Sequence, residues 1–300
     1  MNKHLLLALT LCASLHGYGQ KMHQLASPDG NIQVSINISD KIYYDIVCQK
    51  DTLLKQCNLQ MQLGDEEAGN HPKLIKANRK SINESLKPII ALKHSTVSNK
   101  YNQLQLKFKG DYSVEFRAFD DGIAYRFITN KKGMIEVGNE IFQVNFPENY
   151  LLHMQQPGGF KTAYEEEYRH VQSQEWKATG SMALLPLLID TRKDYKILIS
   201  ESALTDYPAL FLKSNDRNGM LSVFPKVPLE FGEDGDRSLK ILKEANYIAK
   251  TNGQRCFPWR YFVITKDDGQ LIENTMTYKL ADKNVLEDTS WIKPGLASWE

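Results

Sequence analysis

The sequence predicts a mainly β protein, an antiparallel β-sandwich, on the strength of three observations. Polar and apolar residues alternate with a period of two through most of the chain, as in NIQVSINIS at 31–39, whose isoleucines and valine fall on one face. Such runs recur roughly every 8–15 residues to about position 280, a spacing that favours a sandwich over βαβ units. SVEFRAF and IAYRFIT flank the turn DDG at 120–122, which is typical of a β-hairpin.

The N-terminal stretch MNKHLLLALTLCASLHGYG, residues 1–19, predicts a cleaved secretory signal peptide. Lys3 supplies the basic start, Leu5–Leu11 is the apolar run, and small glycines precede a cut that we expect between Gly19 and Gln20. The alternative is a lipoprotein signal that uses Cys12, although a bulky leucine precedes this cysteine where a small residue is expected. The apolar run is too short to span a bilayer. We therefore expect a periplasmic or secreted protein without a membrane span.

The charge balance limits the classes of partner. The chain has 300 residues, with 37 basic and 36 acidic side chains, and 42% of its residues are hydrophobic. Removal of residues 1–19 removes only Lys3, so the mature chain has equal numbers of basic and acidic residues. This balance provides no electrostatic attraction for nucleic acid or an anionic membrane, so neither is expected as a partner. A neutral ligand such as a sugar is compatible with it.

Further strands are predicted from the same alternation along the chain. They lie at 102–110, 183–190, 195–202, 208–213, 221–227, 260–265 and 275–280. Residues 20–280 are therefore interpreted as one N-terminal β domain. The segment 281–300 has no strand period and is interpreted as a linker.

Two stretches interrupt the strand pattern. FKTAYEEEYRHVQSQEW at 160–176 carries Tyr164, Tyr168 and Val171 at helical spacing, which predicts a short helical insertion or an ordered loop. LGDEEAGNHPK at 63–73 is polar and is interpreted as a loop.

The cysteines and histidines predict no zinc site. Cys48, Cys57 and Cys256 remain after the signal, so at least one thiol is unpaired within the chain. A Cys48–Cys57 disulfide and buried free thiols are both compatible with the sequence. The five histidines of the mature chain are scattered without metal-ligand spacing.

Five short motifs in a fixed order resemble the N-terminal half of glycoside hydrolase family 97, a family of secreted bacterial α-glucosidases and α-galactosidases. Each motif alone is weak, and their order over the whole mature chain makes the resemblance specific. They are LASPDGNIQVSINI at 25–38, FRAFDDGIAYRF at 116–127, ILISESALTDYPALFL at 197–212, FPWRYFVI at 257–264 and DTSWIKPGLASWE at 288–300.

The resemblance implies a β-super-sandwich of the galactose-mutarotase type, followed in the family by a catalytic (β/α)8 barrel. The tail from 288 is similar to the family's crossing into the first barrel strand, so we expect residues 281–300 to lead into a barrel that is absent here. The family's general acid and its base or nucleophile lie on the barrel. No position of this chain matches them, so no catalytic residue is expected in it.

One functional residue is implied by the resemblance. Glu201 in ISESALTDYPALFL matches a family glutamate that reaches from the sandwich into the active site and shares a calcium ion with barrel glutamates. Calcium binds 6–8 oxygens, so one carboxylate is only part of such a site. From the pattern alone, Glu201 is a solvated charge at a strand end.

Other candidates are weaker. Glu165 and Tyr168 are possible sugar contacts, although a solvated helix face explains them as well. Trp176 is a candidate exposed platform for a sugar ring. Asp206 and Tyr207 are placed to support the Glu201 loop.

The neighbours Trp259 and Arg260 are a possible cation–π pair, although a packing role explains them better.

The preferred function is therefore the N-terminal, carbohydrate-associated domain of an α-glycosidase that hydrolyses α-linked glucose or galactose oligosaccharides. Its partner would be a catalytic barrel, in cis or in trans, with Ca²⁺ present only in the complete active site. The chain alone is expected to be inactive. The alternatives are a stand-alone carbohydrate-binding module, or an inactive remnant that exposes the apolar surface of a lost interface.

Overall fold

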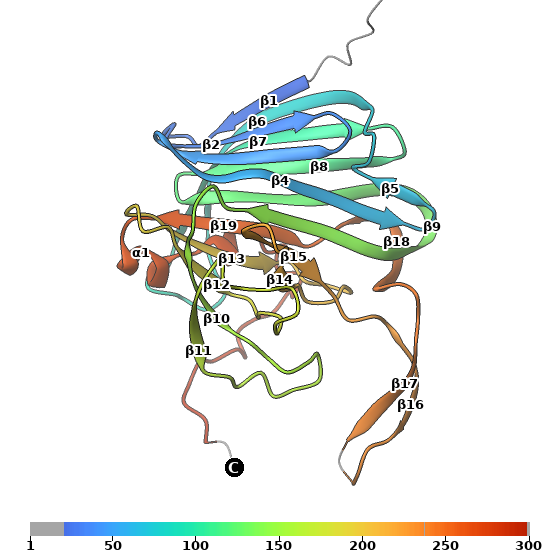
Figure 1. The fold of residues 1–300 in the computed structure, drawn as a ribbon. Coiled ribbons are helices and arrows are strands. Elements are labelled where there is room, and N and C mark those ends of the chain that lie inside the picture. Colours follow the sequence, from blue (N-terminus) through green and yellow to red (C-terminus); the bar gives the residue numbers. More distant parts are fainter. Residues whose placement is uncertain (1–20, 237, 299–300) are drawn as a thin grey trace, which may run out of the picture.

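The computed structural model describes residues 21–236 and 238–298, and these fold into strands with two short helices near the C-terminal end (Figure 1). The first ten strands are β1 (Lys21–Ala26), β2 (Ile32–Ile38), β3 (Ile42–Cys48), β4 (Asp51–Leu63), β5 (Glu66–Ala68), β6 (Leu74–Leu86), β7 (Val97–Phe108), β8 (Tyr112–Phe119), β9 (Gly122–Asn145) and β10 (Leu151–Gln155).

The second half of the chain contains the remaining elements. They are β11 (Tyr168–Gln172), β12 (Leu187–Asp190), β13 (Lys196–Ser202), β14 (Phe211–Ser214), β15 (Gly219–Val223), β16 (Pro228–Glu233), β17 (Leu239–Glu244), β18 (Ala249–Cys256), β19 (Trp259–Thr265), α1 (Asp268–Glu273) and α2 (Met276–Leu280). The signal-peptide prediction for residues 1–19 lies outside the described residues.

Strand β9 connects the two layers of the sandwich. Its first half pairs antiparallel with β8 on one side and with β19 on the other, and β19 continues through β13 and β12 to β10 and β11. Its second half pairs with β4, which continues through β3 and β2 to β1, and also with β15. A strand of 24 residues is long enough to cross from one layer into the other.

The core lies between these layers because alternate side chains of each strand point inward. In β2 the residues with even numbers are buried and those between them are more exposed, the pattern of a strand with one face on the core. Aromatic rings from both layers meet there: Tyr125 stacks on Phe142 with ring centroids 6.3 Å apart, and Phe142 stacks on Phe262 at 5.7 Å. Burial of these rings, together with the aliphatic side chains around them, stabilises the sandwich.

The hairpin predicted around DDG is confirmed. Phe119 of β8 pairs with Gly122 of β9, so Asp120 and Asp121 form the turn. A side chain at Gly122 would place its Cβ 2.1 Å from the carbonyl oxygen of Phe262, so only glycine allows β19 to approach this closely.

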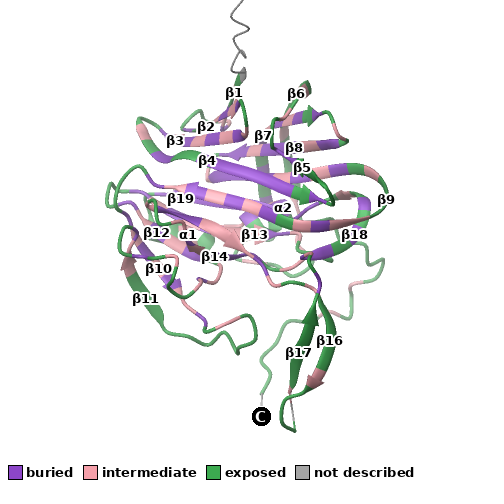
Figure 2. Ribbon diagram, turned by 45° about the vertical axis from the view of Figure 1, so that its right-hand side comes forward, coloured by how far each residue is buried: buried purple, intermediate pink, exposed green. Residues whose placement is uncertain are grey.

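One end of the molecule carries an arm and an extended tail (Figure 1). The arm is the β16–β17 hairpin, which pairs only with itself, and Figure 2 shows it as largely exposed. The segment 281–298 contains no helix or strand and leaves the sandwich at the same end. Neither α1 nor α2, the helices of the described chain, has the length and apolar composition needed to span a membrane.

Three local predictions differ from the structure. Of the two alternatives for residues 160–176, the helical insertion is wrong: residues 160–167 form a loop in which Tyr164 has a positive φ of 59°, and β11 from Tyr168 pairs with β10. Residues 275–280 form helix α2 in place of a strand. Met276 and Leu280 are buried, and their four-residue spacing also fits one helix face, so a run this short does not distinguish the two periods.

The third concerns residues 63–73, which include the short strand β5 paired with β4 in addition to loop. The cysteines Cys48, Cys57 and Cys256 are all free thiols, so the disulfide left open by the sequence is not formed.

Candidate functional site

Glu201 lies near the end of β13, in a row of side chains that crosses the inner face of three strands. Glu201 pairs in register with Arg260 of β19, and Arg260 pairs with Tyr125 of β9. The side chain of Glu201 retains 12% exposure, whereas that of Arg260 retains 1%. The row therefore begins at the protein surface with Glu201 and ends inside the core.

Arg260 holds two carboxylates at once. Its Nε donates to Glu140 Oε1 at 2.8 Å and its Nη2 to Glu140 Oε2 at 2.7 Å, a bidentate pair across the gap between β19 and β9. Its Nη1 donates to Glu201 Oε2. The backbone amide of Leu210 donates to both oxygens of Glu201, at 3.2 and 3.3 Å. We call Glu140, Arg260 and Glu201 the buried ion triad.

The triad sets the charge state of its members. Burial raises the pKa of Glu201, an effect that the Arg260 guanidinium and the Leu210 amide only partly offset. Burial alone would lower the pKa of Arg260, but Glu140 and Glu201 outweigh it and raise this pKa, so the guanidinium stays charged. Glu140 is only 3% exposed and is bound bidentately by Arg260, so its carboxylate is not accessible to a substrate.

The loop 203–210 folds over Glu201 and is fixed by Arg255. Its Nη2 donates to the carbonyl oxygen of Thr205 at 2.8 Å and its Nη1 to that of Asp206 at 3.2 Å. Thr251 Oγ1 donates to Asp206 Oδ2 at 3.0 Å. Tyr207 packs against the Arg260 guanidinium, 5.9 Å from its ring centroid. The predicted support of the Glu201 loop by Asp206 and Tyr207 agrees with these contacts.

Trp259 and Arg260 do not form the cation–π pair given as a possibility, and both are buried, in keeping with the packing role that the sequence favoured. Successive strand residues point to opposite faces, so Trp259 lies on the outer face and packs under two other arginines. The guanidinium carbons of Arg117 and Arg126 lie 4.4 and 4.3 Å from its ring centroid. Arg260 instead faces inward, toward Phe224 at 5.6 Å.

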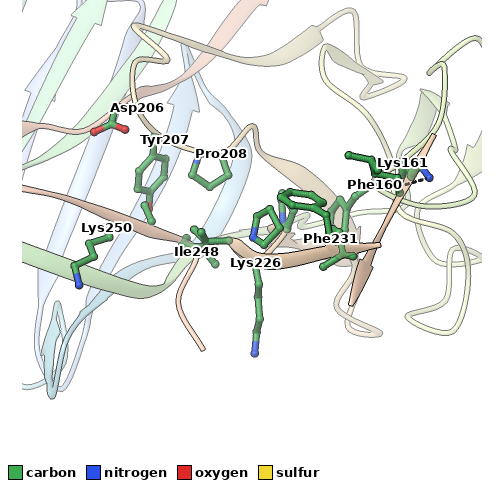
Figure 3. Close-up of a pocket in the computed structure, with 15 residues that line it drawn as sticks. Phe160, Lys161, Asp206, Tyr207, Pro208, Lys226, Phe231, Ile248 and Lys250 are labelled. Carbon is green, nitrogen blue, oxygen red and sulfur yellow. Dashed lines mark hydrogen bonds between the residues drawn. The ribbon is translucent and has the colours of Figure 1, made fainter. Parts of the chain in front are cut away.

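A groove of about 630 Å³ adjoins the loop 203–210 (Figure 3). It lies between this loop, the start of β18 and the β16–β17 hairpin, and its aromatic walls are Phe160, Tyr207 and Phe231. Lys161 Nζ donates to Asp234 Oδ2 at 2.7 Å and to the Leu239 carbonyl oxygen at 2.6 Å. These two hydrogen bonds connect the β16–β17 hairpin to the edge of the groove. The groove therefore connects the Glu201 loop with the exposed arm.

The other predicted sugar contacts lie elsewhere. Glu165 and Tyr168 are exposed, Tyr168 at 56%, on the loop before β11 and at its first residue. Trp176 is only 4% exposed and its Nε1 donates to the carbonyl oxygen of Ser181, so the expectation of an exposed platform is wrong. None of these three lines the groove beside Glu201.

No group of three or more His, Cys, Asp or Glu side chains positioned for a metal ion occurs among residues 21–236 and 238–298. A calcium ion needs 6–8 oxygen ligands. Glu201 supplies one carboxylate, already bound to Arg260, and the only other acid of the triad, Glu140, is held bidentately. The described residues therefore do not form a calcium shell by themselves.

The comparison with known families identifies the domain. Residues 25–282 match the family described as glycosyl-hydrolase 97 N-terminal. The chain belongs to this family. The resemblance inferred from the five motifs is thereby confirmed.

Two curated relatives of this glycosyl-hydrolase 97 N-terminal domain are longer than the chain. The chain is 32% identical over 312 residues to a retaining α-galactosidase of Bacteroides thetaiotaomicron, covering 100% of this chain and 47% of the relative. A probable retaining α-galactosidase of Streptomyces bingchenggensis is 27% identical over 203 residues, covering 66% of this chain and 28% of the relative. The chain thus spans about half the length of the first relative and less of the second.

Solved structures confirm the predicted antiparallel β-super-sandwich. A glycoside hydrolase family 97 enzyme from Pseudoalteromonas sp. strain K8, in complex with acarbose, superposes with a TM-score of 0.77 at 23% identity, over 91% of this chain and 40% of that chain. A variant of it in complex with panose gives the same values. A β-arabinopyranosidase superposes with a TM-score of 0.65 at 19% identity, over 81% of this chain and 40% of that chain. At these identities the likeness shows the fold.

Sequence reasoning missed Glu140 as a partner of the site. It lies 120 residues before Arg260 in an ordinary-looking stretch of β9, and no local motif marks it. The sequence did contain one indication: Glu140 lies on the same strand face as Phe142 and Val144, a face that points into the core. A carboxylate buried on such a face requires a cation as its partner.

Proposed function

We propose that this chain is the N-terminal, carbohydrate-associated part of an α-glycosidase that hydrolyses α-linked oligosaccharides. The observation that carries the proposal is the family match over residues 25–282, in a chain that covers 47% of a relative with a named activity. Because that relative is a retaining α-galactosidase aligned with the whole chain, α-galactosides are the favoured substrate class and retention the favoured outcome. α-Glucosides are the second class. Export through a signal peptide at residues 1–19 is part of the proposal.

The role proposed for Glu201 is to supply one calcium ligand to the complete active site. Its Oε2 is bound to Arg260, so Oε1, which accepts only the shared Leu210 amide among the described residues, is the oxygen available to a metal. Arg260 and the loop 203–210 would hold this carboxylate in one orientation. The remaining oxygen ligands would come from outside the described residues.

The partner proposed for this domain is a catalytic barrel. The end of the molecule with the groove also carries exposed apolar side chains on the arm and tail. They are Leu229, Phe231, Leu239, Ile241, Leu242, Val285, Leu286, Trp291 and Leu296. Exposed apolar surface of this extent is typical of an interface with another domain or chain. A barrel seated here would cover the groove and face Glu201.

The first test is the size and activity of the native protein. An antibody against residues 20–280 is expected to detect a species much larger than 34.3 kDa, and hydrolysis of p-nitrophenyl α-galactoside is expected to copurify with it. The purified 300-residue chain should show no turnover. A native band at the size of the chain itself, or turnover by the chain alone, would overturn the proposal.

The calcium role has its own test in the native, larger protein. Glu201→Gln should weaken calcium binding measured by calorimetry, whereas Glu175→Gln, a change at an exposed glutamate, should not. Equal calcium affinity in the two variants would refute the role of Glu201 and leave the assignment to an α-glycosidase intact.

A stand-alone carbohydrate-binding module is the alternative function, and the groove with its aromatic walls favours it. Calorimetry of the 300-residue chain with maltooligosaccharides separates the two proposals. Saturable binding without turnover, combined with a native protein of the same size, would support the module. A remnant would show neither binding nor a larger native species, and would associate through its exposed apolar end.

A further inference from the structure

A second polar cleft lies on the outer face of β3, β4 and β9, three strands that Figure 2 shows side by side. Its floor is a row of side chains in register: Tyr43 pairs with Asn58, and Asn58 pairs with Gln143. The cleft has a volume of about 510 Å³. This size is sufficient for a small ligand such as a sugar residue or two.

The cleft is separate from the Glu201 site. Gln143 and Glu140 are three residues apart on β9, and alternate strand residues point to opposite faces, so the two side chains point in opposite directions. Glu140 points into the core toward Arg260, whereas Gln143 lines the outer cleft.

Three cationic side chains line the cleft without a counter-ion. Lys41, Lys55 and Arg217 form no ion pair or side-chain hydrogen bond with any described residue, and no carboxylate is among the lining residues. Two acids lie beside the cleft and stay ionised: Asp40, which accepts from Ser39 and Tyr43, and Asp45, which accepts from the backbone amide of Gln56. Three cations against these two acids leave a net positive charge, which favours an anion.

The floor also offers unused hydrogen-bonding capacity. Asn58 is 4% exposed, and its Oδ1 is buried without a hydrogen-bond partner among the described residues. A buried amide oxygen without a donor is unfavourable. Because Oδ1 is shielded from solvent, the Asn58 amide must turn toward the cleft before a ligand hydroxyl can donate to this oxygen and remove the cost. Beside it, Asn145 is held in place, because its Nδ2 donates to the Gln56 carbonyl oxygen at 2.6 Å and its Oδ1 accepts from Gln143 Nε2 at 3.0 Å.

We propose that this cleft binds an acidic saccharide, with ring hydroxyls on Asn58 and Gln143 and a carboxylate or sulfate ester on Lys41, Lys55 and Arg217. Hydroxyl donors satisfy the amide oxygen, and the anionic group satisfies the three cations. The site uses no residue of the Glu201 region. It would hold the domain on acidic polysaccharide whether or not the domain belongs to a glycosidase.

The test is calorimetric titration of the 300-residue chain with four probes: glucuronic acid, glucose 6-sulfate, glucose and inorganic sulfate. The two acidic sugars should bind saturably, with an affinity that falls as salt is added. Glucose and inorganic sulfate should bind far more weakly, because each supplies only half of the contacts. Equal binding of glucose would refute the charge argument, and equal binding of inorganic sulfate would reduce the cleft to an anion site without sugar recognition.

Variants assign the binding to the cleft. Lys55→Gln and Arg217→Gln lie at exposed positions that leave folding intact, and each should weaken binding of the acidic sugars by about tenfold. Lys80→Gln, at an exposed lysine of β6 that lines neither the cleft nor the groove, is the matched control and should change nothing. Unchanged affinity in both cleft variants would overturn the proposal.

Discussion

Replacement of Arg260 by methionine tests how much the buried ion triad contributes to the free energy of unfolding. Within the part of the chain that the structure describes, Arg260 is the cation that binds Glu140, whose side chain is 3% exposed, and it is the side-chain partner of Glu201, so the change removes both interactions. Methionine is similar in length and fills most of the space, so the lost interaction is mainly electrostatic. Two carboxylates would then remain close together without a counter-ion.

The expected magnitude follows from the burial of the pair. Loss of one partner of a fully buried ion pair costs about 3–5 kcal/mol, because the remaining charge is neither solvated nor paired. At about 2.1 cal/mol/K of unfolding entropy per residue, the melting temperature of a 300-residue chain would fall by about 5–8 °C. Urea unfolding followed by tryptophan fluorescence gives the free energy of unfolding, and calorimetry gives the melting temperature.

Two further variants complete the measurement. Lys93→Gln breaks an ion pair with Glu273 in which both side chains are 57% exposed, so it should cost less than about 1 kcal/mol. The double change of Glu140→Leu with Arg260→Met removes the buried carboxylate together with the cation and should recover much of the loss. The reasoning is refuted if Arg260→Met costs no more than Lys93→Gln, or if the double change is less stable than Arg260→Met alone.

Three other outcomes are expected. Burial raises the pKa of Glu201 above its ordinary value. Between these two pKa values the native state binds more protons than the unfolded state, so the free energy of unfolding falls as pH rises. Glu201→Gln should remove this slope from a plot of the free energy of urea unfolding against pH. Trp176→Ala should cost about 3–5 kcal/mol in thermal unfolding and Tyr168→Ala less than about 0.5 kcal/mol, because only Trp176 is buried; equal costs would contradict this. Burial raises the pKa of Cys57 to about 12, so iodoacetamide at mildly alkaline pH should label exposed Cys256 and leave Cys57 unlabelled until urea is added.

Much of the strand content could be predicted because a strand with one buried face shows alternating apolar and polar residues in the local sequence. β2 has the predicted inward isoleucines and valine, and the hairpin at 119–122 follows from its turn residues. The family could be predicted because its motifs are short and local, and ISESALTDYPALFL marked Glu201 before any partner was known.

Local patterns failed where two periods fit the same residues or where burial depends on distant chain. Residues 275–280 fit a strand and a helix equally, and packing of Met276 and Leu280 against β19 decides for the helix. Trp176 has the composition of a sugar platform, but packing against the rest of the core buries it. The exposure of a side chain is a property of its neighbours, which sequence spacing does not specify.

The sequence by itself determined the strand-rich class and the family. These depend on periodicity and on motifs confined to a few consecutive residues. Only the tertiary structure decided what surrounds Glu201 and what lies on the opposite face of the sandwich. Arg260 meets Glu140, and Asn58 aligns with Tyr43 and Gln143, because antiparallel register brings residues far apart in the chain into one row. Register is set by the burial of whole faces, so no single segment encodes it.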